Sequence, residues 1–215
     1  MPTNHLKQIT DKQWNRWLSQ LAHDDYLIVD NFISDQLYQD IVTYFNVLLE
    51  INEFRRAGIG DAQNHQVQTS IRGDFIYWLD KNRDLKLSGF FGLMDDLSLK
   101  LRQYCLLNLS DYEFHLALYP AGARYEKHID QFQGRSNRII TVLIYLNESW
   151  CPKDGGELKI YPSDGQPLIV APIAKRLLLF KSDTVEHEVL ITNAPRKSLT
   201  GWLLHQPASL GQLFL

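Results

Sequence analysis

Apolar residues recur at helical spacing through the first half of the chain. Thr10 and Gln13 have the spacing of a capping box, which predicts that a helix begins there. The apolar stripe of this helix is Trp14, Trp17, Leu18 and Leu21. A short β-rich run at 26–33 precedes Ser34, a candidate N-cap for a second, longer helix. A third helical region is expected at about 85–107, after a strand at 75–79.

From residue 112 the apolar pattern changes to short β-rich runs separated by Pro, Gly, Asn and Asp. These runs are 114–119, 139–146, 157–161, 168–170, 176–180 and 199–204. Short strands at such spacing are typical of a jelly roll. We therefore expect an α+β fold: a double-stranded β-helix (jelly roll) core at 112–205, with the helices of the N-terminal region 1–110 packed on one sheet. No linker separates the halves, which predicts a single domain, 1–215, with a mobile loop at about 56–74.

Composition excludes several classes of function. The 215 residues carry a formal net charge of -3, so no global basic field would attract nucleic acid or an anionic membrane. No signal peptide or membrane-spanning run is evident, which predicts a soluble, cytoplasmic protein. Cys105 and Cys151 are far apart, which argues against a disulfide framework or a structural zinc site. The sequence leaves the oligomeric state open.

Two His-x-Asp triplets are candidates for metal chemistry. The first begins at His23, at the expected end of the first helix, where a histidine beside terminal carbonyls is common and no third ligand follows. The second joins His128 to Asp130, at the end of a strand and before a polar loop. Alternation along a strand would put these two side chains on one face. We interpret the second triplet as the functional one.

A third ligand and an anion-binding residue follow the second triplet. His187 lies where a strand emerges, and Arg196 begins the last long strand. Two imidazoles and one carboxylate, with other positions open, suit ferrous iron that binds a chelating co-substrate. A planar guanidinium on a neighbouring strand suits the distal carboxylate of a keto acid.

Residues 112–204 resemble the iron(II)- and 2-oxoglutarate-dependent prolyl 4-hydroxylases, specifically the oxygen-sensing (hypoxia-inducible-factor) type and its bacterial relatives. The motifs that carry the resemblance are Tyr119-Pro, Tyr125-Glu-Lys-His128-Ile-Asp130, 144–150, 155–162, 176–180, His187 and 196–202. Arg72-Gly-Asp74, before Tyr77-Trp78, is similar to the segment that bounds a substrate-closing loop in that family. The resemblance therefore extends into the first half.

The resemblance implies a role for each matching residue. His128, Asp130 and His187 would bind iron(II), and Arg196 would pair with the distal carboxylate of the co-substrate 2-oxoglutarate. The remaining positions of the co-substrate pocket would be Tyr145, Tyr119, Thr200, Leu158 and Trp202. Arg72 and Asp74 would bound the substrate lid, and ascorbate would support turnover as a reductant.

The implied activity is hydroxylation of a prolyl residue in a protein or peptide, with conversion of 2-oxoglutarate and dioxygen to succinate and carbon dioxide. Elongation factor Tu is one candidate substrate if the chain is bacterial. A small-molecule or free amino acid hydroxylase of the same chemistry is an alternative. Two further alternatives are a non-catalytic jelly-roll binding module and a zinc hydrolase. The retained Arg196 argues against both of them. Neither nucleic acid nor membrane is expected as a partner.

Overall fold

The computed structural model describes residues 9–58, 72–131, 137–163 and 165–205. The helices in these ranges are α1 (Asp11–Asp24), α2 (Asp35–Glu50) and α3 (Ser88–Cys105), with short 3₁₀ turns at Leu85–Leu87 and Pro152–Asp154. The strands are β1 (Tyr26–Val29), β2 (Arg55–Arg56), β3 (Phe75–Trp78), β4 (Leu109–Tyr119), β5 (Tyr125–His128), β6 (Arg138–Tyr145), β7 (Leu158–Tyr161), β8 (Leu168–Val170), β9 (Leu177–Lys181), β10 (Glu186–Val189) and β11 (Arg196–His205).

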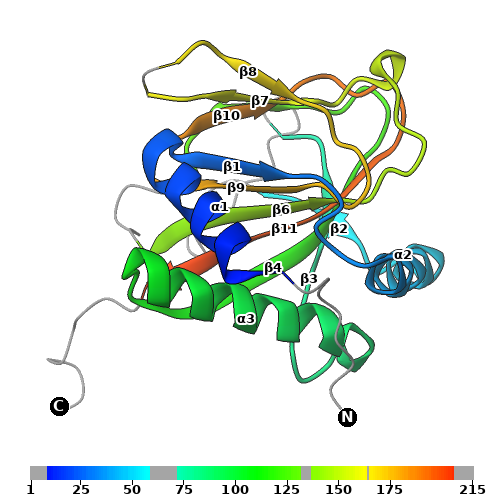
Figure 1. Ribbon diagram of the computed structural model, residues 1–215. Coiled ribbons are helices and arrows are strands. Elements are labelled where there is room, and N and C mark those ends of the chain that lie inside the picture. The colour runs from blue at the N-terminus through cyan, green and yellow to red at the C-terminus, as the bar shows by residue number, and fades with distance from the viewer. Residues whose placement is uncertain (1–8, 59–71, 132–136, 164, 206–215) are drawn as a thin grey trace, which may run out of the picture.

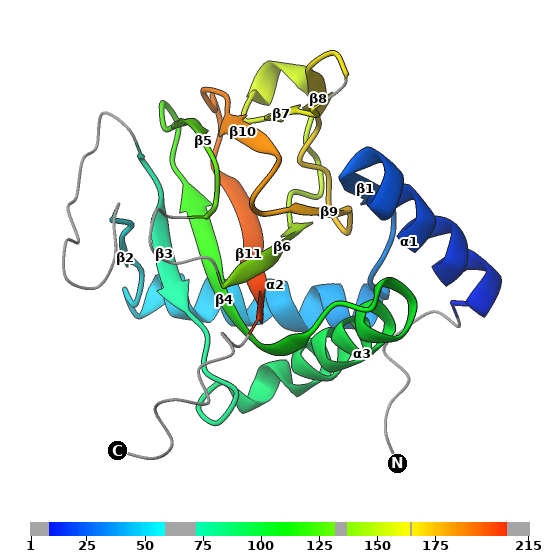
Figure 2. The same cartoon turned by 90° about the vertical axis from the view of Figure 1, so that its left-hand side faces the viewer.

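The strands form two antiparallel sheets. The major sheet has the order β1-β9-β6-β11-β4-β3-β2, and the minor sheet has the order β5-β10-β7-β8. Figures 1 and 2 show the minor sheet on one side of the major sheet and the helices on the other. The prediction of a jelly-roll core with helices packed on one sheet is confirmed.

The helices begin where their capping residues predict. The Thr10 side chain accepts a hydrogen bond from the Gln13 backbone N–H, and the Gln13 side chain accepts one from the Thr10 backbone N–H. These two hydrogen bonds form the expected capping box of α1. Ser34 caps α2 in the same way, through the backbone N–H of Leu37. The apolar faces of the helices pack with the outer face of the major sheet in one continuous cluster. This core holds the major sheet rigid behind the site.

A second core lies between the two sheets. Its buried members include Ala117, Tyr119, Leu143, Tyr145, Leu158, Ile160, Leu178, Phe180 and Val189. They come from both sheets, because alternate residues of each strand point toward the opposite sheet. The candidate site lies beside this inner core.

Several boundaries differ from the expectations. The run at 26–33 forms a strand only to Val29, and the third helix starts at Ser88 after a 3₁₀ turn. The short polar strand β2 was not predicted, whereas β5 and β10 lie where the sequence placed a strand ending at His128 and a strand emerging at His187. Of the expected mobile loop, 59–71 lies outside the described residues. Among the helices that are described, none is long and apolar enough to cross a bilayer.

Candidate metal centre and co-substrate cavity

Side chains of the neighbouring strands β4, β11 and β6 of the major sheet form one wall of a cavity, because alternate residues of each strand point to the same face. The inward residues of β11 are Arg196, Ser198, Thr200 and Trp202. Across the sheet, Arg196 lies opposite Tyr119 of β4, and Ser198 lies opposite Tyr145 of β6. These side chains face the minor sheet because residues two apart along a strand share a face. The cavity between the sheets has a volume of about 530 Å³.

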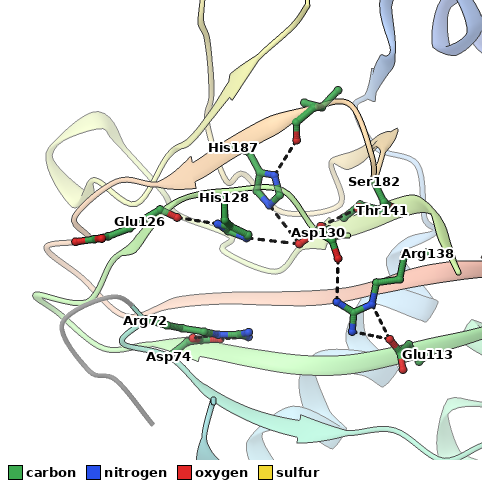
Figure 3. Close-up of polar contacts among 11 residues, drawn as sticks. Arg72, Asp74, Glu113, Glu126, His128, Asp130, Arg138, Thr141, Ser182 and His187 are labelled. Carbon is green, nitrogen blue, oxygen red and sulfur yellow. Dashed lines mark hydrogen bonds and ion pairs between the residues drawn. The ribbon is translucent and has the colours of Figure 1, made fainter. Parts of the chain in front are cut away.

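The three predicted metal ligands meet at one end of this cavity (Figure 3). His128 ends β5 and lies directly opposite His187 of β10 in the minor sheet. Asp130 is in the bend that follows β5, so it is not in a strand as the alternation argument assumed. Its Oδ1 is 3.5 Å from His128 Nε2 and 3.7 Å from His187 Nε2. The candidate ligand atoms all lie within 4.8 Å of one another.

Backbone carbonyls set the orientation of both imidazole rings. His128 Nδ1 is 2.7 Å from the Glu126 carbonyl oxygen, and His187 Nδ1 is 3.2 Å from that of Val185. A carbonyl can only accept, so each Nδ1 carries a proton and donates it. In a neutral ring, the Nε2 lone pair then faces Asp130 and is available to a metal.

Burial sets the charge state of this cluster. It lowers the pKa of His187 to about 4, so this ring is neutral at ordinary pH and can act as a ligand. Burial also opposes ionisation of Asp130, but the positive charge that His187 and His128 carry when they are protonated outweighs it, and the pKa of this carboxyl is lowered. Two imidazoles and one carboxylate suit iron(II) better than structural zinc, which favours four closed ligands.

The other end of the cavity has unsatisfied polar groups. Arg196 is 2% exposed; its Nε donates to the Gly156 carbonyl oxygen at 2.7 Å, and its Nη2 has no hydrogen-bond partner among the described residues. The fully buried Tyr145 hydroxyl also lacks one, and its ring centre is 5.1 Å from Arg196 Cζ. Buried donors without partners are costly. A carboxylate ligand would satisfy both.

The remaining predicted pocket residues lie close by. Tyr119, Thr200, Leu158 and Trp202 line the cavity together with Arg196 and the three candidate ligands. Tyr145 does not line it and lies beside Arg196 instead. Burial raises the pKa of Tyr119 well above its usual value, so this tyrosine remains a neutral hydrogen-bonding group.

The two predicted lid residues contact the metal cluster through an aromatic side chain. Arg72 binds Asp74 through two hydrogen bonds of 2.7 and 2.9 Å, and its guanidinium lies 4.8 Å from the Tyr125 ring centre. The Tyr125 ring stacks on His128 at a centroid distance of 3.7 Å. The segment that the pair was expected to bound, 59–71, lies outside the described residues.

Several neighbours of the site are not among the site residues predicted from the sequence. Thr141 contacts Asp130, Gly156 holds Arg196, and the guanidinium of Arg138 lies 3.5 Å from the Trp202 ring centre. His115 lines the same cavity between Trp78 and Trp202. Strand alternation signals Thr141, two positions before Leu143, whereas nothing local signals the carbonyl of Gly156. His23 lies exposed in the last turn of α1, away from any metal cluster among the described residues.

Comparison with known proteins relates this arrangement to a family. The sequence profile of the 2OG-Fe(II) oxygenase superfamily matches residues 114–204. A hypoxia-inducible factor prolyl hydroxylase of Caenorhabditis elegans is 29% identical over 199 residues, which are 83% of this chain and 26% of that protein. The chain thus spans about a quarter of the length of this curated relative.

Two solved structures are similar over almost their full length. A prolyl-4-hydroxylase of Pseudomonas putida is 33% identical with a TM-score of 0.82, covering 90% of this chain and 99% of that one. A prolyl hydroxylase of Trichoplax adhaerens, in complex with a peptide from the hypoxia-inducible factor oxygen degradation domain, is 28% identical with a TM-score of 0.80, covering 92% and 93%. The chain belongs to the 2OG-Fe(II) oxygenase superfamily and, within it, to the prolyl 4-hydroxylases.

Proposed function

We propose that this protein is an iron(II)- and 2-oxoglutarate-dependent dioxygenase that hydroxylates a prolyl residue in a peptide or protein. One observation carries the proposal. A cluster of two imidazoles and a carboxylate shares a cavity with a buried arginine that lacks a partner for Nη2. A metal and a dicarboxylate bound together would satisfy both ends.

In this proposal each residue has a defined task. His128, Asp130 and His187 hold the metal through Nε2, a carboxylate oxygen and Nε2. Arg196 and Tyr145 bind the distal carboxylate of 2-oxoglutarate, while Leu158 and Tyr119 enclose the co-substrate and exclude water. Thr200 and Trp202 form the wall opposite the minor sheet. Iron(II) with 2-oxoglutarate and dioxygen supplies the oxidising chemistry that turns a C–H bond into C–OH, with succinate and carbon dioxide as co-products.

The entrance of the cavity supports a peptide substrate. Trp78 and Ile129 both line the cavity, although their side chains are 45% and 38% exposed. Large exposed apolar side chains at a cavity mouth are typical of a binding surface. The solved structure of the Trichoplax relative is a complex with a peptide fragment. A peptide that binds across Trp78 and Ile129 and delivers a proline into the cavity fits both observations.

Anaerobic reconstitution with iron(II), followed by addition of oxygen, 2-oxoglutarate and peptides, tests the proposal. We expect succinate formation and a mass gain of one oxygen atom on proline-containing peptides, and no gain on matched peptides with alanine in place of proline. Elongation factor Tu is tested as one protein substrate, because its role as the substrate remains a prediction. Ascorbate is added and omitted in parallel reactions.

Two variants separate the alternatives. His187→Ala should abolish metal binding, and Arg196→Ala should retain the metal but lose 2-oxoglutarate. If free amino acids or small molecules gain an oxygen atom and none of the peptides or proteins does, the proposed peptide or protein substrate is wrong. If the wild-type protein binds metal without forming any succinate, it is a binding module.

A further inference from the structure

Two buried hydroxyl groups stand behind the candidate carboxylate ligand. Thr141 of β6 and Ser182, which follows β9, are 1% and 0% exposed. Thr141 Oγ1 is 2.8 Å from Asp130 Oδ2 and 2.9 Å from Ser182 Oγ. Figure 3 shows Thr141 and Ser182 beside Asp130, on the opposite side from the two imidazole rings.

The number of protons available determines which group donates in each of these two hydrogen bonds. The ionised carboxylate can only accept, so the single hydroxyl proton of Thr141 is donated to Asp130 Oδ2. That proton is then unavailable for the contact with Ser182. Ser182 must therefore donate to Thr141 Oγ1. A hydroxyl that accepts one hydrogen bond while donating another is polarised and donates more strongly.

The two carboxylate oxygens of Asp130 consequently have different surroundings. Oδ1 faces His128 Nε2 and His187 Nε2, whereas Oδ2 is engaged by Thr141. The carboxylate plane is thereby fixed, and one oxygen is directed toward the ligand cluster. Such outer hydrogen bonds orient metal-binding carboxylates in proteins generally.

The backbone on both sides of the hydroxyl pair is also fixed. The Ser182 N–H donates to the Ile139 carbonyl at 3.0 Å, and the Gln131 N–H donates to the Ser182 carbonyl at 3.2 Å. Gln131 Nε2 also donates to the Arg138 carbonyl at 2.9 Å. The residue after Asp130 is thus attached to the major sheet at two points, so the bend and the hydroxyl pair form one rigid unit.

We infer that Ser182 and Thr141 are positioning residues that hold Asp130 so that a single carboxylate oxygen, Oδ1, is available to a metal. The inference rests on the proposed function, which makes Asp130 a ligand. It adds two residues that touch neither co-substrate nor substrate in that proposal. Their effect is exerted through the orientation of Asp130.

Mn(II) binding by the 215-residue chain, measured without oxygen by electron paramagnetic resonance of the unbound ion, tests this inference without turnover. Thr141→Val has nearly the same shape and lacks the hydroxyl group. We expect its dissociation constant to rise about 10- to 100-fold. Thr141→Ser restores a hydroxyl and should recover most of the affinity. Ser182→Ala should have a smaller effect, because Thr141 can still donate to Asp130.

Controls separate positioning from folding. Thr184→Val removes a hydroxyl that contacts Asp183 instead, and should bind Mn(II) like the wild type. Thermal unfolding without metal verifies that each variant folds. If Thr141→Val folds and binds Mn(II) as tightly as the wild type, the inference is wrong. If the wild type itself does not bind Mn(II), the proposed metal site fails instead.

Discussion

Tyr145→Phe should affect stability and co-substrate binding in opposite directions. The hydroxyl is fully buried and lacks a hydrogen-bond partner among the described residues, and burial raises its pKa, so it stays protonated. A buried unsatisfied polar group costs about 1–3 kcal/mol. Its removal should therefore leave the ligand-free protein as stable as the wild type, or up to about 1 kcal/mol more stable, after allowing for the small void left behind. The melting temperature should rise by roughly 0–4 °C.

With 2-oxoglutarate the direction reverses. A hydrogen bond to a charged carboxylate contributes about 1.5–3 kcal/mol, so the variant should bind 2-oxoglutarate roughly 10- to 150-fold more weakly. Thermal unfolding with Mn(II), with and without 2-oxoglutarate and in the absence of oxygen, measures both effects on the same sample. A Tyr145→Phe variant that unfolds earlier without ligand and keeps wild-type affinity would show that the hydroxyl is structural.

Two further predictions concern the scaffold. Asp84 accepts hydrogen bonds from Tyr44, Tyr77 and Arg83. Burial raises the pKa of the Asp84 carboxyl, but these hydrogen bonds outweigh burial and lower it. The carboxylate therefore stabilises the fold above its unfolded pKa near 4, and this stability is lost as the pH falls through the lower folded pKa. Asp84→Asn should cost about 1–3 kcal/mol at pH 7 and less at pH 3, below the unfolded pKa, and urea unfolding at both values checks this. Gly201→Ala should lower the stability of the fold by about 1–3 kcal/mol, because a Cβ would overlap the Glu113 carbonyl oxygen and the Phe114 ring. Gly92→Ala in α3 is the control: its Cβ meets no atom within 4 Å, so this variant should be neutral or stabilising. Thermal unfolding of both variants measures the difference.

The sequence predicted the fold class because its signals are local. The capping box at Thr10 and the helical stripe after it require only neighbouring residues, and long apolar strands such as β6 stand out from their surroundings. The polar strand β5 carries no such signal. Its place in the minor sheet is set by its pairing with β10, a contact between residues about 60 positions apart.

The candidate site was predictable to a similar extent. Motif spacing predicted His128, His187 and Arg196 as site residues, and the structure places all three in one cavity. The carbonyl of Gly156 and the hydroxyl of Ser182 belong to common residues, and only the folded chain places them against Arg196 and Thr141. A backbone carbonyl has no sequence signature, and Ser182 follows the end of β9, so strand alternation does not signal it.

The position of Asp130 explains why both sheets are needed for the site. The two imidazole rings belong to the minor sheet, whereas the hydroxyl that holds the Asp130 carboxylate belongs to the major sheet. The geometry of the ligand cluster therefore depends on the packing between the sheets, where the Phe180 ring of β9 lies 4.7 Å from that of His187. A closely packed core transmits small shifts to its neighbours. Phe180→Leu should therefore weaken Mn(II) binding at the candidate metal centre, although Phe180 offers no ligand atom.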